Sequence, residues 1–556
     1  MDTVYLSAAY VLIWLGPEHR LLDDFRWACT TLRIRCQELQ KTSKKVPPLN
    51  DVQSWTAAGH ADAVRRFRNA VLFSAICRWF DRTWVVQEAV LATRIEVLCG
   101  STLLPWFGIA WLGLQFHTFR PLSPDAILPE KLALSQSIGR RVWHMQTNRV
   151  YTGDPSAFNW AASTDTGRFV MSLMELLQLF RSTECFDSRD KVYAMLGIVR
   201  RKVGQYMKDL SISGSIRVDY GKMTWQEVYY AVAKLAIDHL DSLVLLNSVQ
   251  MAGIDDDPQL PSWVPDLSRF MNITPIHQRS IAKDPFRVWP KKQLANGNAK
   301  VDEKRLMVKG IKIDDIQPEK FPSHPPLLGL LQLAGSTRIR NKQSSRIEAL
   351  VSALTMRDIT RKIPGWSPSV LKQAFCALVQ DSFSTAIREY QDLKVAEIPD
   401  VLDQISDILQ HYQDEVRRSE LPTLEILLET VACKAIAKSK TASEEEKRTA
   451  AAALIQIEQL STPPIRNIEQ MRALFETRGG TLGIGPISVD DAAGTDEVWM
   501  LASADVPFIL RRVKHHDAKE WTFKLLGDCY LHECMHGQIL EDNPNLIERL
   551  QNIVLV

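Results

Sequence analysis

The sequence predicts an α/β unit at the N-terminus, then a mainly α-helical region, and a small β-rich module at the C-terminus. Over residues 1–120, strand-like and helical stretches alternate, which is typical of a parallel sheet with helices packed against it. From residue 478 onward, short β-like runs are separated by turn residues, which favours a compact β module. We therefore divide the chain into four predicted domains: an α/β unit (1–120), a mixed, mainly helical middle (121–335), a further helical region (336–475) and the β-rich module (476–556).

The two predicted strands of the N-terminal unit are short and apolar. The run "VLIWLG" (11–16) ends in a Gly-Pro turn, which indicates a buried strand that leads into a loop. The run "RIEVLCG" (94–100) has the same character and follows a helical stretch. Because strands separated by helices pair in parallel, we expect Trp14 and Leu15 to lie on or end a strand beside that of Val97.

Helical spacing of apolar residues predicts the other elements of the first two domains. This spacing covers 25–39 and 61–92 in the N-terminal unit. In the middle region it covers 171–198, where a polar loop around Asp187 interrupts it. The segment 224–240 reads as an amphipathic helix that begins at a threonine cap.

In the C-terminal module, apolar and polar residues alternate in "EVWMLA" and "FKLLGDCY". Alternation with a period of two residues predicts strands with one buried face. We therefore expect 478–540 to fold as strands, with Trp499, Phe508 and Tyr530 buried.

Composition limits the classes of function. The chain has 556 residues, 46% of them apolar, and a formal net charge of +2, so it can bury sizeable cores and has no strongly basic half. Its nine cysteines lie far apart, which favours reduced thiols and a cytoplasmic protein over a secreted disulfide framework. The most apolar window, 105–116, is too short to span a membrane, and Asp2 stands where a signal peptide requires a basic residue. We expect no membrane span and no nucleic-acid partner.

Residues 78–100, "RWFDRTWVVQEAVLATRIEVLCG", combine large aromatic and charged side chains. If 74–92 forms one helix, its aromatic residues share a face, and Glu88 follows Trp84 by one turn on the same side. No Lys or Arg lies three or four residues from Glu88, so burial beside the indole should raise the pKa of its carboxyl. Such a carboxyl suits a general acid or base, and it can equally cap a neighbouring loop through backbone N–H groups.

A cluster of Cys and His residues near the C-terminus raises the alternative of a zinc site. Cys529, His532, Cys534 and His536 have the spacing C-x-x-H-x-C-x-H. Structural zinc sites usually take their ligands from two separate knuckles, whereas these four residues lie in one short run. We therefore assign no metal and no resident cofactor to the chain.

The tryptophan-rich stretch resembles the hallmark motif of the fungal heterokaryon incompatibility (HET) domain, R-P-W-F-x-R-x-W-x-x-Q-E followed by V-x-C-G. All of the motif except its proline is present, at Arg78, Trp79, Phe80, Arg82, Trp84, Gln87, Glu88, Cys99 and Gly100. The opening "MDTVYLSAAYVLIWLG" is similar to the family's M-x-x-I-Y-x-x-A-x-x-V-x-V-W-L-G, and "DSRDKVYAMLGI", "LPSWVPDLS" and "FKLLGDCYLHECMHGQIL" resemble later motifs. In the last of these, Glu533 and Gln538 depart from the usual Gly and Glu. The resemblance covers most of the chain outside 336–470.

The HET domain is thought to be distantly related to the Toll/interleukin-1 receptor (TIR) fold, so the resemblance implies a partial TIR-like domain at 1–120. Many TIR domains cleave NAD with a glutamate that follows a tryptophan by four positions on a helix, and Trp84-x-x-x-Glu88 has that spacing. The resemblance thus implies a catalytic Glu88 and a Trp84 that binds NAD, as a substrate. A carboxylate there could stabilise the oxocarbenium-like charge that forms as the glycosidic bond breaks.

The family's opening segments, an S-Y-C-W-G strand and a D-x-x-C-I-N-Q strand, are absent from this sequence, so we expect an N-terminally truncated HET domain with impaired activity. A sheet without such strands leaves unpaired backbone groups and exposed apolar faces. The resemblance implies a role in heterokaryon incompatibility, non-self recognition and programmed cell death in filamentous fungi. We expect a signalling and interaction module with protein partners or self-association, and NAD cleavage through Glu88 is the alternative.

Overall fold

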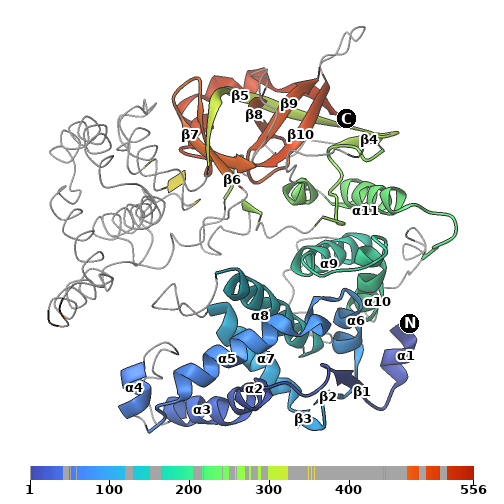
Figure 1. Cartoon of the computed structure of the whole chain (residues 1–556). Helices are drawn as coiled ribbons and strands as arrows, with labels where there is room; N and C mark the ends of the chain where they lie inside the picture. Colours follow the sequence, from blue (N-terminus) through green and yellow to red (C-terminus); the bar gives the residue numbers. More distant parts are fainter. Residues whose placement is uncertain are drawn as a thin grey trace, which may run out of the picture. The chain divides into compact units, whose positions relative to one another are not determined.

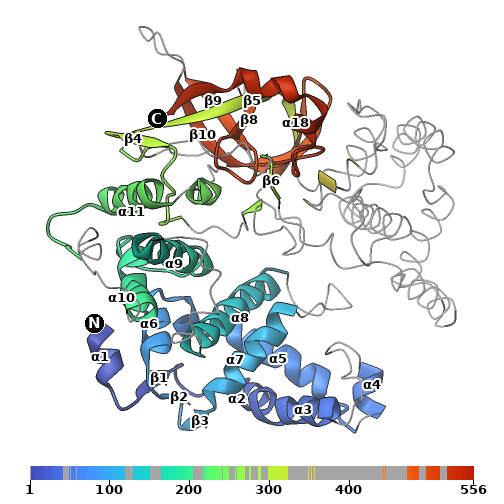
Figure 2. The same ribbon diagram turned by 180° about the vertical axis from the view of Figure 1, so that it is seen from behind.

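The fold is that of a computed structural model (Figures 1 and 2). The prediction for 336–475 falls almost entirely outside the described residues and stays a prediction. Apart from a few single positions between them, the structure describes residues 2–41, 52–57, 59–118, 129–150, 164–204, 218–240, 242–249, 259–269, 286–289, 299–322, 472–486, 496–513 and 522–556.

The chain forms two compact units. The first comprises Met1–Leu240 with Asp266–Asn272, and the second comprises Asp241–Pro265 with Ile273–Val556. In the described residues the first unit is mainly helical around a small sheet, and the second contains a nine-stranded sheet. The chain therefore combines helices and sheets, as the predicted fold class requires.

The sheet of the first unit contains β1 (Val11–Trp14), β2 (Ile95–Cys99) and β3 (Thr102–Leu104), in that order. β1 runs parallel to β2, with Trp14 opposite Leu98, and β2 turns back into antiparallel β3. This pairing confirms the prediction that the two apolar runs form neighbouring strands.

Helices make up most of the first unit, and two of the predicted boundaries are confirmed. The break near Asp187 falls between α9 and α10, where the guanidinium of Arg189 donates to the Asp187 carboxylate at 2.6 Å. The predicted cap at Thr224 is present, because the Glu227 N–H donates to its hydroxyl at 3.3 Å and the Thr224 N–H donates to the Glu227 carboxylate at 2.7 Å. The helices are α1 (Asp2–Ser7), α2 (Leu22–Trp27), α3 (Arg33–Lys41), α4 (Val52–Ala57), α5 (Ala63–Ile76), α6 (Trp84–Leu91), α7 (Trp106–Thr118), α8 (Pro129–Val150), α9 (Asp165–Leu179), α10 (Asp190–Gly204) and α11 (Trp225–His239), with a π-helical turn at Ala28–Leu32.

α7 and α8 cross at very short range because each carries a glycine at the contact. A Cβ atom on Gly139 would lie 2.4 Å from the carbonyl oxygen of Gly113. No other residue fits at that distance without displacing the backbone, so this pair sets the spacing of the two helices. α8 is thereby held where its side chains reach the tryptophan-rich motif.

Five strands of the second unit close into a ring, in the order β5–β8–β9–β10–β12 and back to β5. All neighbours in the ring are antiparallel except β10 and β12. β6, β7 and β11 extend the sheet beyond β5. The strands are β4 (Lys300–Asp302), β5 (Arg305–Pro322), β6 (Arg472–Thr477), β7 (Leu482–Pro486), β8 (Asp496–Leu501), β9 (Phe508–Val513), β10 (Thr522–Asp528), β11 (Tyr530–Leu531) and β12 (Gln551–Leu555).

The predicted strands and buried aromatic residues of the C-terminal segment are confirmed. Trp499, Phe508 and Tyr530 are 2%, 0% and 0% exposed. A fully buried ion pair joins β6 to the end of β10, with Arg472 and Asp528 at 2.7 Å. The Asp528 backbone carbonyl accepts a second bond from the same guanidinium at 2.9 Å, so both partners of the pair are held by hydrogen bonds as well as charge.

The sequence pattern did not predict β5, which pairs with β4, β6, β8 and β12. Its alternation of apolar and polar residues is lost where the pairing with β8 shifts register between Lys312 and Asp314. Its charges are also partnered, because the Lys312 amine donates to Glu497 at 3.0 Å and to Asp315 at 2.7 Å. A bulge and a local charge network thus concealed the strand pattern.

Among the described residues, no helix is both long and apolar enough to cross a membrane. All of the apolar window 105–116 except its first residue lies in α7, which is one of the packed helices of the first unit.

Candidate functional site

The tryptophan-rich motif is not one continuous helix, and that expectation is wrong. α5 ends at Ile76, a 3-10 turn covers Arg78–Asp81, and Arg82 is extended before α6 begins. The cause is a second segment that pairs with the motif: the Thr83 N–H donates to the Glu184 carbonyl at 2.8 Å, and the Glu184 N–H donates to the Asp81 carbonyl. These bonds take backbone groups that a helix would have used.

The break adds a second tryptophan beside Glu88. Trp79 and Phe80 are buried, as expected for anchors of the motif, and their rings meet edge to face at 5.3 Å. Trp84, the expected neighbour of Glu88, is only partly buried, at the first position of α6. The indole N–H of Trp79 lies within hydrogen-bonding reach of the Glu88 carboxylate, while Trp84 stays one helical turn from Glu88 on α6. The spacing of residues along one continuous helix could not predict that Trp79 contacts Glu88, because the contact depends on the helix break between them.

Glu88 has the raised pKa that the sequence predicts. Burial is the main cause, and it outweighs the opposing effects of Arg82 and of hydrogen bonds from Trp79 and Tyr5. The sequence shows no Lys or Arg three or four residues from Glu88. The nearby positive charge that opposes the pKa shift comes instead from Arg82, which lies six residues earlier on the extended segment. Tyr5 lies on α1, so the N-terminal helix packs on α6 and supplies a hydroxyl at the carboxylate.

Hydrogen bonds to two other helices hold α6 in place. The Arg149 guanidinium on α8 donates to the Ala89 carbonyl at 2.8 Å and to the Ala92 carbonyl at 2.6 Å, which satisfies the C-terminal end of α6. Gln87, itself a motif residue, donates to the Ala194 carbonyl on α10 at 3.3 Å. These contacts fix the orientation of α6, and nothing in the local sequence indicates them.

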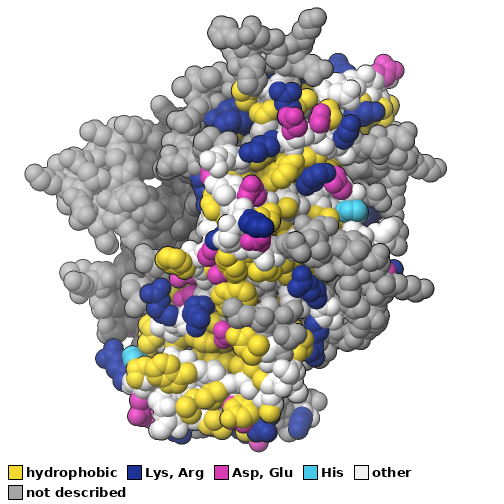
Figure 3. Space-filling model, turned by 90° about the vertical axis from the view of Figure 1, so that its right-hand side faces the viewer, with side chains coloured by type: hydrophobic (Ala, Val, Ile, Leu, Met, Phe, Trp, Pro, Cys, Tyr) yellow, Lys and Arg dark blue, Asp and Glu magenta, His cyan; other side chains and the backbone are white. Residues whose placement is uncertain are grey.

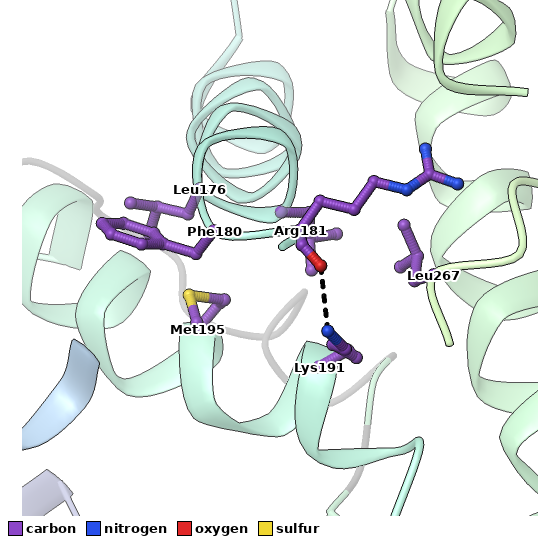
Figure 4. Close-up of a pocket in the computed structure, with 7 residues that line it drawn as sticks. Leu176, Phe180, Arg181, Lys191, Met195 and Leu267 are labelled. Carbon is purple, nitrogen blue, oxygen red and sulfur yellow. Dashed lines mark hydrogen bonds between the residues drawn. The ribbon is translucent and has the colours of Figure 1, made fainter. Parts of the chain in front are cut away.

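A small cavity in the first unit lies between α9 and α10 (Figure 4). The cavity leaves no room for a water molecule. The Lys191 amine donates to the carbonyls of Arg181 and Thr183, and burial lowers its pKa to about 8. The amine thus ties down the turn that follows α9, and the cavity is a packing feature with no space for a ligand. The lining residues are Leu176, Leu177, Phe180, Arg181, Lys191, Met195 and Leu267.

In the second unit, the Cys and His cluster is dispersed within the protein core. Cys529, His532 and Cys534 are buried, and burial holds the pKa of the Cys529 thiol well above its usual range. The Cys534 thiol contacts the Met500 sulfur at 3.7 Å. Within the described residues, no three Cys, His, Asp or Glu side chains converge in a way that could hold a metal ion.

Comparisons with models of known protein families, with curated proteins and with solved structures find no match to this chain. The roles that the resemblance implies for Glu88 and Trp84 are therefore carried forward as proposals.

Proposed function

We propose that this chain is a HET-type protein that acts as a signalling and interaction module in non-self recognition and programmed cell death of filamentous fungi. The motif resemblance supports it, together with the parallel pairing of the two strands that carry parts of those motifs. The observation that carries the proposal is the surface of the N-terminal sheet, where Leu12 and Trp14 on β1 are 53% and 59% exposed.

Exposed apolar residues on an edge strand are unusual in a chain that acts alone. Edge strands of natural proteins commonly carry charges or are covered, because an open edge invites another strand. Isolated exposed apolar side chains need no explanation, but a cluster of them on a sheet edge favours a binding surface. A tryptophan at such a position supplies a large contact area with a small loss of conformational freedom on binding.

Growth of a filamentous fungus that expresses the chain tests this function. We expect wild type to arrest growth and Trp14→Lys to abolish the arrest at an unchanged melting temperature. Ile34→Lys is the matched control, because Ile34 is 49% exposed on α3, away from the sheet, and this variant should behave as wild type. Growth arrest that is equal in all three proteins would overturn the proposal.

Cleavage of NAD through Glu88 is a second candidate function, favoured by the raised pKa of a half-buried carboxyl among Tyr5, Trp79 and Arg82. In this reaction the bond between nicotinamide and ribose breaks, nicotinamide leaves, and water adds to the ribose carbon. An ionised Glu88 would stabilise the positive charge that develops on the ribose.

The NAD-cleavage candidate is tested by incubating purified full-length chain with NAD and measuring the release of nicotinamide. If the candidate is right, Glu88→Gln loses release by about a hundredfold or more, as is common when a group that stabilises transition-state charge is removed. Glu96→Gln is the control, because Glu96 lies on β2 and pairs with Arg94 at 2.8 Å. No release by wild type, or equal release by wild type and Glu88→Gln, would exclude it.

A further inference from the structure

The three-stranded sheet of the first unit ends at a strand whose outer edge has no partner among the described residues. β1 pairs with β2 only. The Val11 N–H donates to the Arg94 carbonyl at 2.8 Å, and the Leu15 N–H donates to the Leu98 carbonyl at 2.9 Å. In a parallel ladder, a residue bonded in this way turns both its N–H and its C=O toward the neighbour, and alternate residues turn theirs away. The backbone groups of Leu12 and Trp14 therefore point to the open edge.

The same two residues belong to an apolar row that crosses the sheet. Trp14 lies opposite Leu98 on β2, and Leu98 lies opposite Leu103 on β3. Leu103 is 63% exposed, so the row faces outward along with Leu12. Figure 3 shows hydrophobic side chains exposed in the lower part of the view, on the first unit. The open edge thus offers both hydrogen-bonding groups and an apolar surface that a further strand would continue.

The charges around β1 favour a second copy of this chain as that partner. The segment "SAAYVLIWLG" (7–16) carries no charged residue. A two-fold contact places a surface against itself, so any net charge on the strand would repel its counterpart. Beside the start of β1, the charge of Arg94 is already paired with Glu96 on β2 at 2.8 Å, so it adds no repulsion between two copies. A two-fold axis perpendicular to the sheet makes the two paired strands antiparallel.

We propose that β1 pairs with β1 of a second copy in an antiparallel arrangement, which joins two three-stranded sheets into one. The proposal rests on the interaction function above and names its partner. The hydrogen-bonded ladder with β2 runs from Val11 to Leu15, so its centre, Ile13, lies on the two-fold axis. Residues on one face must lie opposite residues on the same face. Leu12 therefore lies opposite Trp14 of the second copy, and each such pair exchanges two backbone hydrogen bonds.

This register is tested with two single-cysteine variants of the full chain, Leu12→Cys and Trp14→Cys. Residues directly opposite in a hydrogen-bonded pair have Cα atoms about 5.5 Å apart, which suits a disulfide, whereas diagonal neighbours are about 7–8 Å apart. We expect oxidation of the mixed variants to give several times more covalent dimer than oxidation of either variant alone. Wild type reports the background from the native cysteines. Equal cross-linking in every sample, or no cross-linking in the mixture, would overturn the register.

The assembly itself is tested by sedimentation of wild type, Leu12→Pro and the control Ile34→Ser, whose residue is exposed on α3. The Leu12 N–H points to the open edge, so proline there keeps the ladder with β2 and removes a donor that the second copy needs. We expect a dimer for wild type and Ile34→Ser, and a folded monomer for Leu12→Pro whose melting temperature, unlike that of wild type, does not depend on protein concentration. A wild-type monomer, or a dimer that Leu12→Pro leaves intact, would overturn the pairing.

The two proposals can fail separately. A monomeric wild type that still arrests growth, and loses this effect in Trp14→Lys, would contradict the pairing and leave the interaction function standing. A dimer that Leu12→Pro disrupts, in a chain with no effect on growth, would support the pairing and contradict the function.

Discussion

The Arg141 guanidinium on α8 donates to the Asp81 carboxylate at 2.8 Å and to the Ser182 carbonyl at 2.7 Å. One buried side chain therefore binds the end of the 3-10 turn in the tryptophan-rich motif and the segment that interrupts the predicted helix. Because Arg141 is only 1% exposed, its positive charge depends on these partners.

Arg141→Met should lower the free energy of unfolding by about 3 kcal/mol, because it leaves a partly buried carboxylate without its cation. Arg78→Met is the control, since the Arg78 side chain is 86% exposed and lies 3.5 Å from Glu184. That change should cost less than about 0.5 kcal/mol. Denaturant unfolding of both variants measures the difference, and equal losses would contradict the role given to Arg141.

Lys191 predicts a pH dependence of stability. Burial lowers the pKa of its amine from 10.5 to about 8, so between these values the unfolded chain binds more protons than the folded chain. The contribution of this group to the free energy of unfolding should therefore rise as the pH increases from about 8 to 10.5. Melting curves across this range should show that rise in wild type and its loss in Lys191→Met.

Near pH 10.5 the Lys191→Met variant should be less stable than wild type by about 1–3 kcal/mol, because two carbonyl acceptors lose a donor that no longer carries the cost of burying a charge, and the loss should be smaller at pH 7. Lys234→Met is the control, since Lys234 is 44% exposed and pairs with Asp238 on the surface of α11. Parallel pH curves for wild type and Lys191→Met would show that the amine is not desolvated.

Glu88→Gln should not destabilise the protein at pH 7. The raised pKa means that folding disfavours the ionised carboxyl, and this penalty is relieved as the pH falls toward the folded-state pKa. The stability of the variant relative to wild type should therefore decline as the pH is lowered from 7 to about 4, near the ordinary carboxyl pKa. A loss of about 1–3 kcal/mol at pH 7 would mean that hydrogen bonds from Tyr5 and Trp79 outweigh the cost of burial.

The sequence alone predicted the elements whose pattern depends on residues close together in the chain. The apolar run at 11–16 predicted β1, Thr224 marked the start of α11, and alternation placed Trp499 in the core. Each of these depends on residues close together in the chain, where periodicity and capping chemistry decide the outcome.

The candidate site was predicted only in part, because distant segments determine it. The raised pKa of Glu88 followed from its apolar neighbours, but its contacts with Tyr5 and Trp79 depend on a helix break. That break exists because Glu184, about a hundred residues later in the chain, bonds to the backbone of Thr83. No local pattern contains that information, and β5 was missed for a related reason, since its bulge appears only against β8.

Growth of a filamentous fungus that expresses Trp14→Lys or Glu88→Gln, with NAD content measured in the same cells, tests the central claim most directly. The account predicts that wild type and Glu88→Gln arrest growth with NAD unchanged, and that Trp14→Lys does not arrest growth. The claim would be contradicted if Trp14→Lys arrested growth like wild type, while Glu88→Gln abolished both the arrest and a loss of NAD.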